Sequence, residues 1–144
     1  MNLINYQNEF QKLLERKYFP SEMHPLRKDA FTKLEATGFP TQKWENWRFT
    51  NLSALTDNHF LISEVKDAPQ NSIDTSQYEI EGVETIVIYN GHFQRDISSI
   101  PDGIELLTGS EYIERNNNEL IHSEKSPFDL LNTAFTDSGM CIVV

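Results

Sequence analysis

Residues 38–55, GFPTQKWENWRFTNLSAL, contain the densest group of large aromatic side chains in this sequence. Two phenylalanines and two tryptophans fall within eleven residues, namely Phe39, Trp44, Trp47 and Phe49. The stretch begins with Gly38 and Pro40, which stop helices, so the aromatic residues follow a break. Because aromatic side chains bury large apolar surfaces, we interpret the stretch as the centre of a core covered by flanking helices and strands. The alternative is an exposed aromatic platform for a ligand.

Upstream of this stretch, apolar residues recur at helical spacing. Residues 2–18 are expected to form an amphipathic helix that ends before Pro20. A second helix is expected between Pro25 and Gly38, because proline suits the first turn of a helix and glycine its C-terminal cap. The apolar faces of the two helices consist of Leu3, Tyr6, Phe10, Leu13 and Leu14 in the first and Leu26, Ala30, Phe31 and Leu34 in the second.

Downstream, the first signals are helical turns. Thr41 is expected to cap a short helix through Trp44 and Trp47, and Thr50 or Asn51 to open another turn. The polar residues 66–76 then predict a connector, which is the best boundary candidate in the chain. The sequence therefore divides into a helical part at 1–65, the connector at 66–76 and an α/β part at 77–144, together forming one compact α+β domain.

Beyond the connector, the apolar pattern changes from helical to extended. A β-branched run at 85–89 is followed by Asn90-Gly91, which predicts a hairpin because both residues accept positive φ. Residues 100–103 predict a turn and residues 104–107 a further strand. Ser110 is expected to cap a short helix, and Ser126 with Pro127 to open a late one.

The last residues of the sequence, 140–144, are MCIVV, an apolar run without a polar tail. This run resembles a strand cut partway, so the chain is expected to be the front part of a longer protein. Unpaired strand edges are templates for other strands. We expect the run either to fold back onto the strand at 86–89 or to pair with a second copy, giving a homodimer through the C-terminal strand.

Charge limits the classes of partner. The formal net charge is −10, and it is uneven: residues 1–50 contain eight Lys and Arg against six Asp and Glu, whereas residues 51–144 contain four against sixteen. The acidic part should be repelled by phosphate backbones, so we expect no nucleic-acid partner. No apolar run approaches the roughly 20 residues of a membrane helix, and a single cysteine fits a reducing compartment. A soluble, cytoplasmic protein without a membrane partner is expected.

Motifs that carry chemistry are missing from the sequence. It has no phosphate-binding glycine loop and no nucleophile elbow, and the histidines at 24, 59, 92 and 122 are widely separated. We therefore predict no catalytic, cofactor-binding or metal residues and no cofactor. Cys141 lies in apolar surroundings and is interpreted as a structural strand residue. The carboxylates of Glu79 and Glu81 are interpreted as part of a solvated strand face.

Arg48 is the one residue in the central stretch for which two roles stay open. It lies between Trp47 and Phe49 in the sequence. Its guanidinium could bind the carboxylate of a partner. Alternatively, it could stack on an aromatic ring within the protein.

The central stretch also resembles a known family. Its pattern, with Gly38-Phe39-Pro40-Thr41, Lys43, Trp47-Arg48-Phe49-Thr50, Leu52 and Leu55, is similar to the N-terminal region of SufD in the SufB/SufD family of iron–sulfur cluster assembly proteins. Glu45 is a departure, because family members often have an acidic residue directly beside the second tryptophan. Residues 87–93 and 126–135 resemble two later family segments, so the resemblance runs from about Pro25 to the end.

The resemblance implies an N-terminal domain of a SufD-like subunit of the SufBCD complex, which is related to ABC transporters through its ATPase. It implies SufB-like and SufC-like subunits as partners of the full-length protein. The parallel β-helix and the C-terminal helices of the family would lie beyond Val144. A non-catalytic protein-interaction or structural module follows. A stand-alone acidic protein-binding domain and a small enzyme of unrecognised type are the alternatives.

Overall fold

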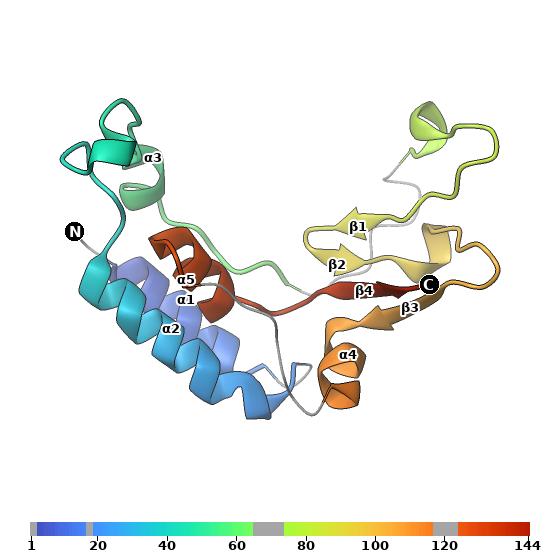
Figure 1. The fold of residues 1–144 in the computed structure, drawn as a ribbon, viewed down its shortest axis with the longest axis horizontal. Helices are drawn as coiled ribbons and strands as arrows, with labels where there is room; N and C mark the ends of the chain where they lie inside the picture. Colours follow the sequence, from blue (N-terminus) through green and yellow to red (C-terminus); the bar gives the residue numbers. More distant parts are fainter. Residues whose placement is uncertain (1–2, 17–18, 65–73, 117–123) are drawn as a thin grey trace. The chain divides into compact units, whose positions relative to one another are not determined.

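The computed structural model describes residues 3–16, 19–64, 74–116 and 124–144. The chain forms two compact units: unit 1 consists of residues 1–62 and 118–137, and unit 2 of residues 63–117 and 138–144. Helices dominate unit 1, and two small antiparallel sheets lie in unit 2 (Figure 1), which confirms the predicted α+β class. Most of the connector predicted at 66–76 lies outside the described residues. The late helix belongs to unit 1, although it follows the strands of unit 2 in the sequence.

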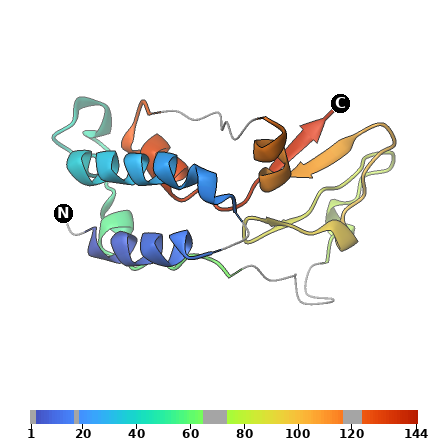
Figure 2. The ribbon, with the colours of Figure 1, turned by 90° about the horizontal axis from the view of Figure 1, so that it is seen from below.

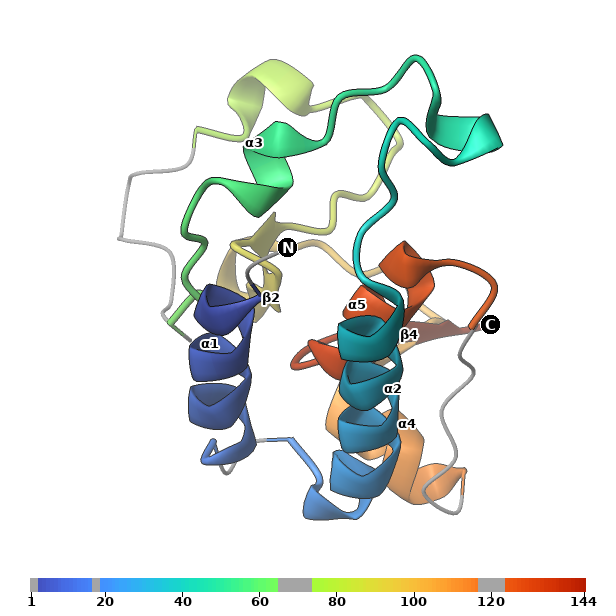
Figure 3. The same ribbon diagram turned by 90° about the vertical axis from the view of Figure 1, so that its left-hand side faces the viewer.

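Three of the described helices supply most of the core of unit 1: α1 (Ile4–Leu14), α2 (His24–Thr37) and α5 (Pro127–Ala134). Helices α1 and α2 run antiparallel side by side, and α5 packs on α2 (Figure 3). The rings of Phe10 and Phe31 stack with their centres 4.4 Å apart and join the first two helices. Each fully buried apolar side chain contributes roughly 1.5–3 kcal/mol. The buried core consists of Phe10, Leu13, Ala30, Phe31, Leu34, Phe39, Leu130 and Ala134.

The helix ends of unit 1 follow the sequence signals. A 3₁₀ turn, η1 (Ser21–Met23), leads into α2, whose first turn contains Pro25. Ser126 caps α5 in a capping box with Asp129, as predicted for the late helix. The first helix ends at Leu14, four residues before the predicted end at 18, and residues 17–18 lie outside the described part. The short helix α3 (Ser53–Thr56) begins just after the expected start. Its N-cap residue is Leu52, which forms no side-chain cap bond, and the N–H of Ser53 donates to the side chain of Asn51 over 2.9 Å.

The predicted hairpin is confirmed in unit 2. Strands β1 (Ile88–Tyr89) and β2 (His92–Phe93) pair antiparallel around Asn90 and Gly91, whose φ angles are 48° and 87°. These positive values are those of a type I′ turn, which suits the twist of two paired strands. The pairing continues outside the strands, since the N–H of Gln94 donates to the carbonyl oxygen of Val87 over 2.9 Å. Short 3₁₀ turns precede and follow the hairpin at η3 (Ser76–Tyr78) and η4 (Arg95–Ile97).

The second sheet pairs β3 (Glu105–Thr108) antiparallel with β4 (Met140–Val143), so the expected C-terminal strand is present (Figure 2). The run does fold back within the chain, but the expected sheet was wrong: β4 pairs with β3, whereas residues 88–89 belong to the other sheet. The backbone segments next to the two strands also lie close together, since the N–H of Gly109 donates to the carbonyl oxygen of Gly139 over 2.8 Å. A Cβ added at Gly109 would lie 3.2 Å from the backbone of Gly139. Pairing with a second copy stays a prediction.

Helix α4 (Gly109–Arg115) follows β3 directly and closes the small core of unit 2. Its cap is Thr108, not the expected Ser110, because Thr108 and Glu111 form a reciprocal capping box. Ile113 on this helix is 1% exposed. Leu106, Leu107 and Val87 are also buried in unit 2.

Candidate protein-interaction surface

The stretch with both tryptophans begins at a firmly held residue. Helix α2 stops at Gly38, which has φ 69° and donates its N–H to the carbonyl oxygen of Leu34 over 2.7 Å. The next side chain, Phe39, is only 2% exposed. Its ring lies 5.4 Å from that of Tyr6 and 5.8 Å from that of Phe128, centre to centre. Aromatic pairs at these distances contribute about 0.5–1.5 kcal/mol beyond the burial of area, so Phe39 anchors the stretch to unit 1.

After Phe39 the chain forms a series of tight turns. Backbone hydrogen bonds run from Trp44 to Thr41, from Trp47 to Trp44 and from Thr50 to Trp47, each between residues three apart. Among these turns, only the one at η2 (Glu45–Trp47) forms a 3₁₀ helix. The predicted short helix capped by Thr41 is therefore wrong. The Thr41 hydroxyl accepts a bond from Lys43 in a local turn, and the backbone follows the i to i+3 pattern instead of the α-helical one.

This geometry overturns the interpretation of the whole stretch as core. Phe49 is 93% exposed and Trp44 is 39% exposed, whereas Trp47 is half-buried with its ring 5.1 Å from that of Phe128. In an α-helix only Trp44 and Trp47, three residues apart, would share a face, and the observed turns leave the ring of Phe49 in solvent. We call residues 44–49 the tryptophan segment. Held at Phe39 and Trp47, it presents apolar rings to solvent and fits the alternative of an aromatic platform.

Arg48 lies at the exposed end of the tryptophan segment. Its Cζ is 5.7 Å from the centre of the Phe49 ring, so the predicted aromatic stacking is present. An exposed cation–π contact contributes about 0.5–1 kcal/mol. Among the described residues Arg48 forms no ion pair. The guanidinium therefore combines a charge with an aromatic face, a pairing that is enriched in protein interfaces.

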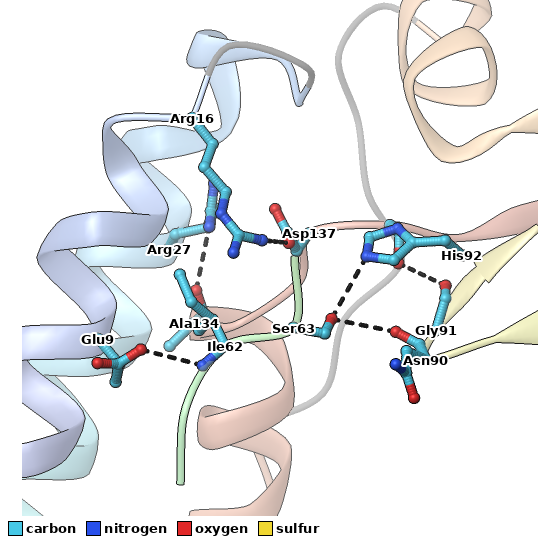
Figure 4. A network of polar contacts seen from close by, with 11 residues as sticks. Glu9, Arg16, Arg27, Ile62, Ser63, Asn90, Gly91, His92, Ala134 and Asp137 are labelled. Carbon is cyan, nitrogen blue, oxygen red and sulfur yellow. Dashed lines mark hydrogen bonds and ion pairs between the residues drawn. The ribbon is translucent and has the colours of Figure 1, made fainter. Parts of the chain in front are cut away.

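Two arginines of unit 1 are bonded to the end of α5 and to the residues after it (Figure 4). Arg27 is 1% exposed, and its Nε donates to the carbonyl oxygen of Ala134 over 3.2 Å. Arg16 forms an ion pair with Asp137 at 2.6 Å. The sequence analysis missed Arg27, although a signal existed: it occupies the apolar stripe of α2, three positions before Ala30. Both arginines fix the end of α5 and the residues after it, so their role is structural.

Glu9 joins α1 to the segment that follows α3. Its side chain is 4% exposed and accepts a bond from Lys12 over 2.5 Å. It also accepts a bond from the N–H of Ile62 over 3.0 Å (Figure 4). The bond from Lys12, followed by that from Ile62, lowers the pKa of the Glu9 carboxyl below its ordinary value. A buried carboxylate is stable only when it is paired in this way.

Ser63 and His92, both in unit 2, are the closest approach to a catalytic pair that we find in the described ranges. The Ser63 hydroxyl lies 3.3 Å from Nε2 of His92 and donates to the carbonyl oxygen of Asn90 over 3.1 Å (Figure 4). Because the hydroxyl also donates to a backbone carbonyl, and the direction of its bond with the imidazole depends on the histidine tautomer, the pair lacks the fixed geometry of an activated nucleophile. The contact instead holds the hairpin turn, together with the bond from Ser138 to Gly91 at 2.7 Å.

A profile of the family described as SufBD protein N-terminal region matches residues 1–144. The chain belongs to the SufBD family. Membership links this SufBD N-terminal region to iron–sulfur cluster assembly by the Suf system, and it extends the sequence resemblance, which began at about Pro25, to the first residue. Comparisons with curated proteins and with solved structures give no match.

The SufBD N-terminal region has few groups that could hold a cofactor. Where the structure describes the chain, no three His, Cys, Asp or Glu side chains come together as metal ligands would. His24, His59 and His92 lie apart along the fold, and His122 lies outside the described residues. Cys141 lies in β4 and is partly exposed, opposite Leu107 of β3. No described helix is both long and apolar enough to cross a membrane.

Proposed function

We propose that this SufBD N-terminal region belongs to a SufD-like subunit of a SufBCD complex and acts there as a non-catalytic protein-interaction and structural module. Its partners are the SufB-like and SufC-like subunits, and its compartment is the cytoplasm. The single observation that carries the proposal is the tryptophan segment, which is held by Phe39 and Trp47 while Phe49 remains 93% exposed. Exposed aromatic residues beside an arginine are the composition of interface hot spots.

The absence of recognised catalytic motifs supports a module without catalysis. Glu9 and Arg27, two buried polar side chains of unit 1, are bonded to backbone groups. Such bonds stabilise a fold. The iron or cluster that the Suf system builds is cargo of the whole complex, so this region need not bind it.

Photo-crosslinking tests the proposal. Phe49→p-benzoylphenylalanine in the intact protein should crosslink to a purified SufB-like or SufC-like subunit when the complex is irradiated. The matched control carries the same group at Ile4, which is 55% exposed on α1. A product from position 49 and none from position 4 supports the proposal. Equal yields from both positions, or no product with either subunit, would refute the assignment of the tryptophan segment as the contact.

A further inference from the structure

Unit 2 contains an open groove of about 500 Å³ between two extended segments. One wall is formed by residues around the turn at 80–83, in which the N–H of Val83 donates to the carbonyl oxygen of Ile80 over 3.0 Å. The other wall is formed by residues 97–99. The walls are joined by two bonds between Thr85 and Ser99, at 2.8 and 2.9 Å. These bonds make the groove a preformed feature, which lowers the entropy cost of binding.

Three of the side chains that line the groove are apolar, and the described residues leave them exposed. Ile80 is 66% exposed, Val83 57% and Ile97 43%, and all three line the groove. A single exposed apolar side chain is common on protein surfaces, but several that share a concave site indicate an interaction surface. The core of unit 2 does not reach them, since its buried residues lie on β3, α4 and the hairpin.

The same groove is acidic. Glu79 and Glu81 line it on either side of Ile80, and within the described ranges neither of them forms an ion pair. No Lys or Arg lines the groove. The sequence analysis interpreted these two carboxylates as a solvated strand face. Both carboxylates are exposed, but they lie on either side of an apolar side chain at the groove and not on a strand.

We propose that this groove binds an extended segment of another protein that carries Lys or Arg side chains beside branched apolar ones. The apolar side chains would cover Ile80, Val83 and Ile97, and the cations would meet Glu79 and Glu81. Charge complementarity decides the occupant: an acidic segment or a nucleic acid would be repelled, and a purely apolar one would leave two carboxylates unpaired. The proposal goes beyond the proposed function, because it concerns a surface separate from the tryptophan segment.

Fluorescence anisotropy tests whether the groove binds such a segment, with a short labelled peptide that alternates lysine and valine. The peptide should bind, and added salt should weaken the binding. Two matched peptides, one alternating glutamate and valine and one alternating lysine and serine, should bind more weakly. Equal binding of the glutamate peptide would overturn the electrostatic part of the proposal, and equal binding of the lysine–serine peptide would overturn the apolar part.

Variants locate the site. The double variant Glu79→Gln, Glu81→Gln should weaken the lysine–valine peptide about fivefold, as expected for the loss of two exposed ion pairs. The control variant Asp102→Asn, Glu114→Gln removes the same charge from exposed positions of unit 2 outside the groove and should change affinity less than about twofold. Ile80→Ser should weaken binding, whereas Ile88→Ser, at an exposed position on β1 outside the groove, should not. Equal losses in the paired variants would show diffuse attraction to an acidic protein and overturn the proposal.

Discussion

Phe39 and Phe49 are the same residue type ten positions apart, and we expect opposite consequences when each is replaced by alanine. Phe39 is 2% exposed and contacts two aromatic rings, whereas Phe49 is 93% exposed. Truncation of a buried phenylalanine costs about 3–5 kcal/mol, because it loses the transfer free energy of the ring and leaves a cavity. A surface truncation changes stability by less than about 0.5 kcal/mol. Phe39→Ala should therefore destabilise unit 1 strongly, and Phe49→Ala should not.

Urea denaturation followed by tryptophan fluorescence measures the difference. Both tryptophans, Trp44 and Trp47, lie in unit 1, so the signal reports on the unit that contains both substitutions. With a slope of about 2 kcal/mol per molar urea, the Phe39→Ala midpoint should fall by about 2 M. Because total stability is only about 5–15 kcal/mol, Phe39→Leu provides a milder change if the alanine variant does not fold. Equal midpoints for Phe39→Ala and Phe49→Ala would refute the assignment of one ring to the core and the other to the surface.

Four further outcomes are expected. Trp47→Ala should cost about 1–2 kcal/mol, less than a core truncation, because its ring is only half-buried on Phe128; a urea midpoint equal to that of the parent would contradict this contact. The lowered pKa of Glu9 means that the carboxyl holds its proton less tightly in the folded protein than in the unfolded one. The ionised carboxylate therefore stabilises the fold above the ordinary pKa of 4.5, and this contribution is lost as the pH falls through the lower folded pKa. Urea midpoints measured across that acidic range should therefore fall more steeply for the parent than for Glu9→Gln, and parallel profiles would argue against the buried pairing. Anaerobic reconstitution with iron and sulfide should leave the protein colourless, since the sequence has one cysteine and scattered histidines; stoichiometric iron with visible absorption would contradict that. Light scattering over a concentration series, on the chain and on a version ending at Gly139, tests the predicted homodimer: a dimer that persists in the shorter version cannot be caused by β4.

Local features of the fold were predictable because they depend on a few adjacent residues. Pro25, Gly38 and Asn90-Gly91 fix backbone conformations through their own φ preferences, so the start of α2, its end and the hairpin turn were all anticipated. Caps are less certain, because several residues near a helix start can accept the same bonds. Thr108 caps α4 instead of Ser110, since the reciprocal bond with Glu111 is available only from Thr108.

The sequence predicted where the candidate site lies, but not that its aromatic side chains are exposed. The sequence located the aromatic stretch and offered both a core and a platform, and the platform was the alternative to the favoured interpretation. Aromatic content shows how much surface a stretch could bury, but it does not show whether another element arrives to cover it. The groove with Glu79, Ile80 and Glu81 was missed for the same reason, because its second wall comes from residues 97–99.

By itself, the sequence determined the α+β class, the start and end of α2, the hairpin turn, the acidic balance and the motif of the SufBD family. The tertiary structure alone decided that Phe39 is buried while Phe49 is exposed, that Arg27 lies in the core, and that β4 pairs with β3. The physical reason is the range of the forces involved. Backbone preferences act over a few residues, whereas burial and strand pairing depend on contacts between segments that are distant in sequence, such as α2 with α5 or Leu107 with Cys141.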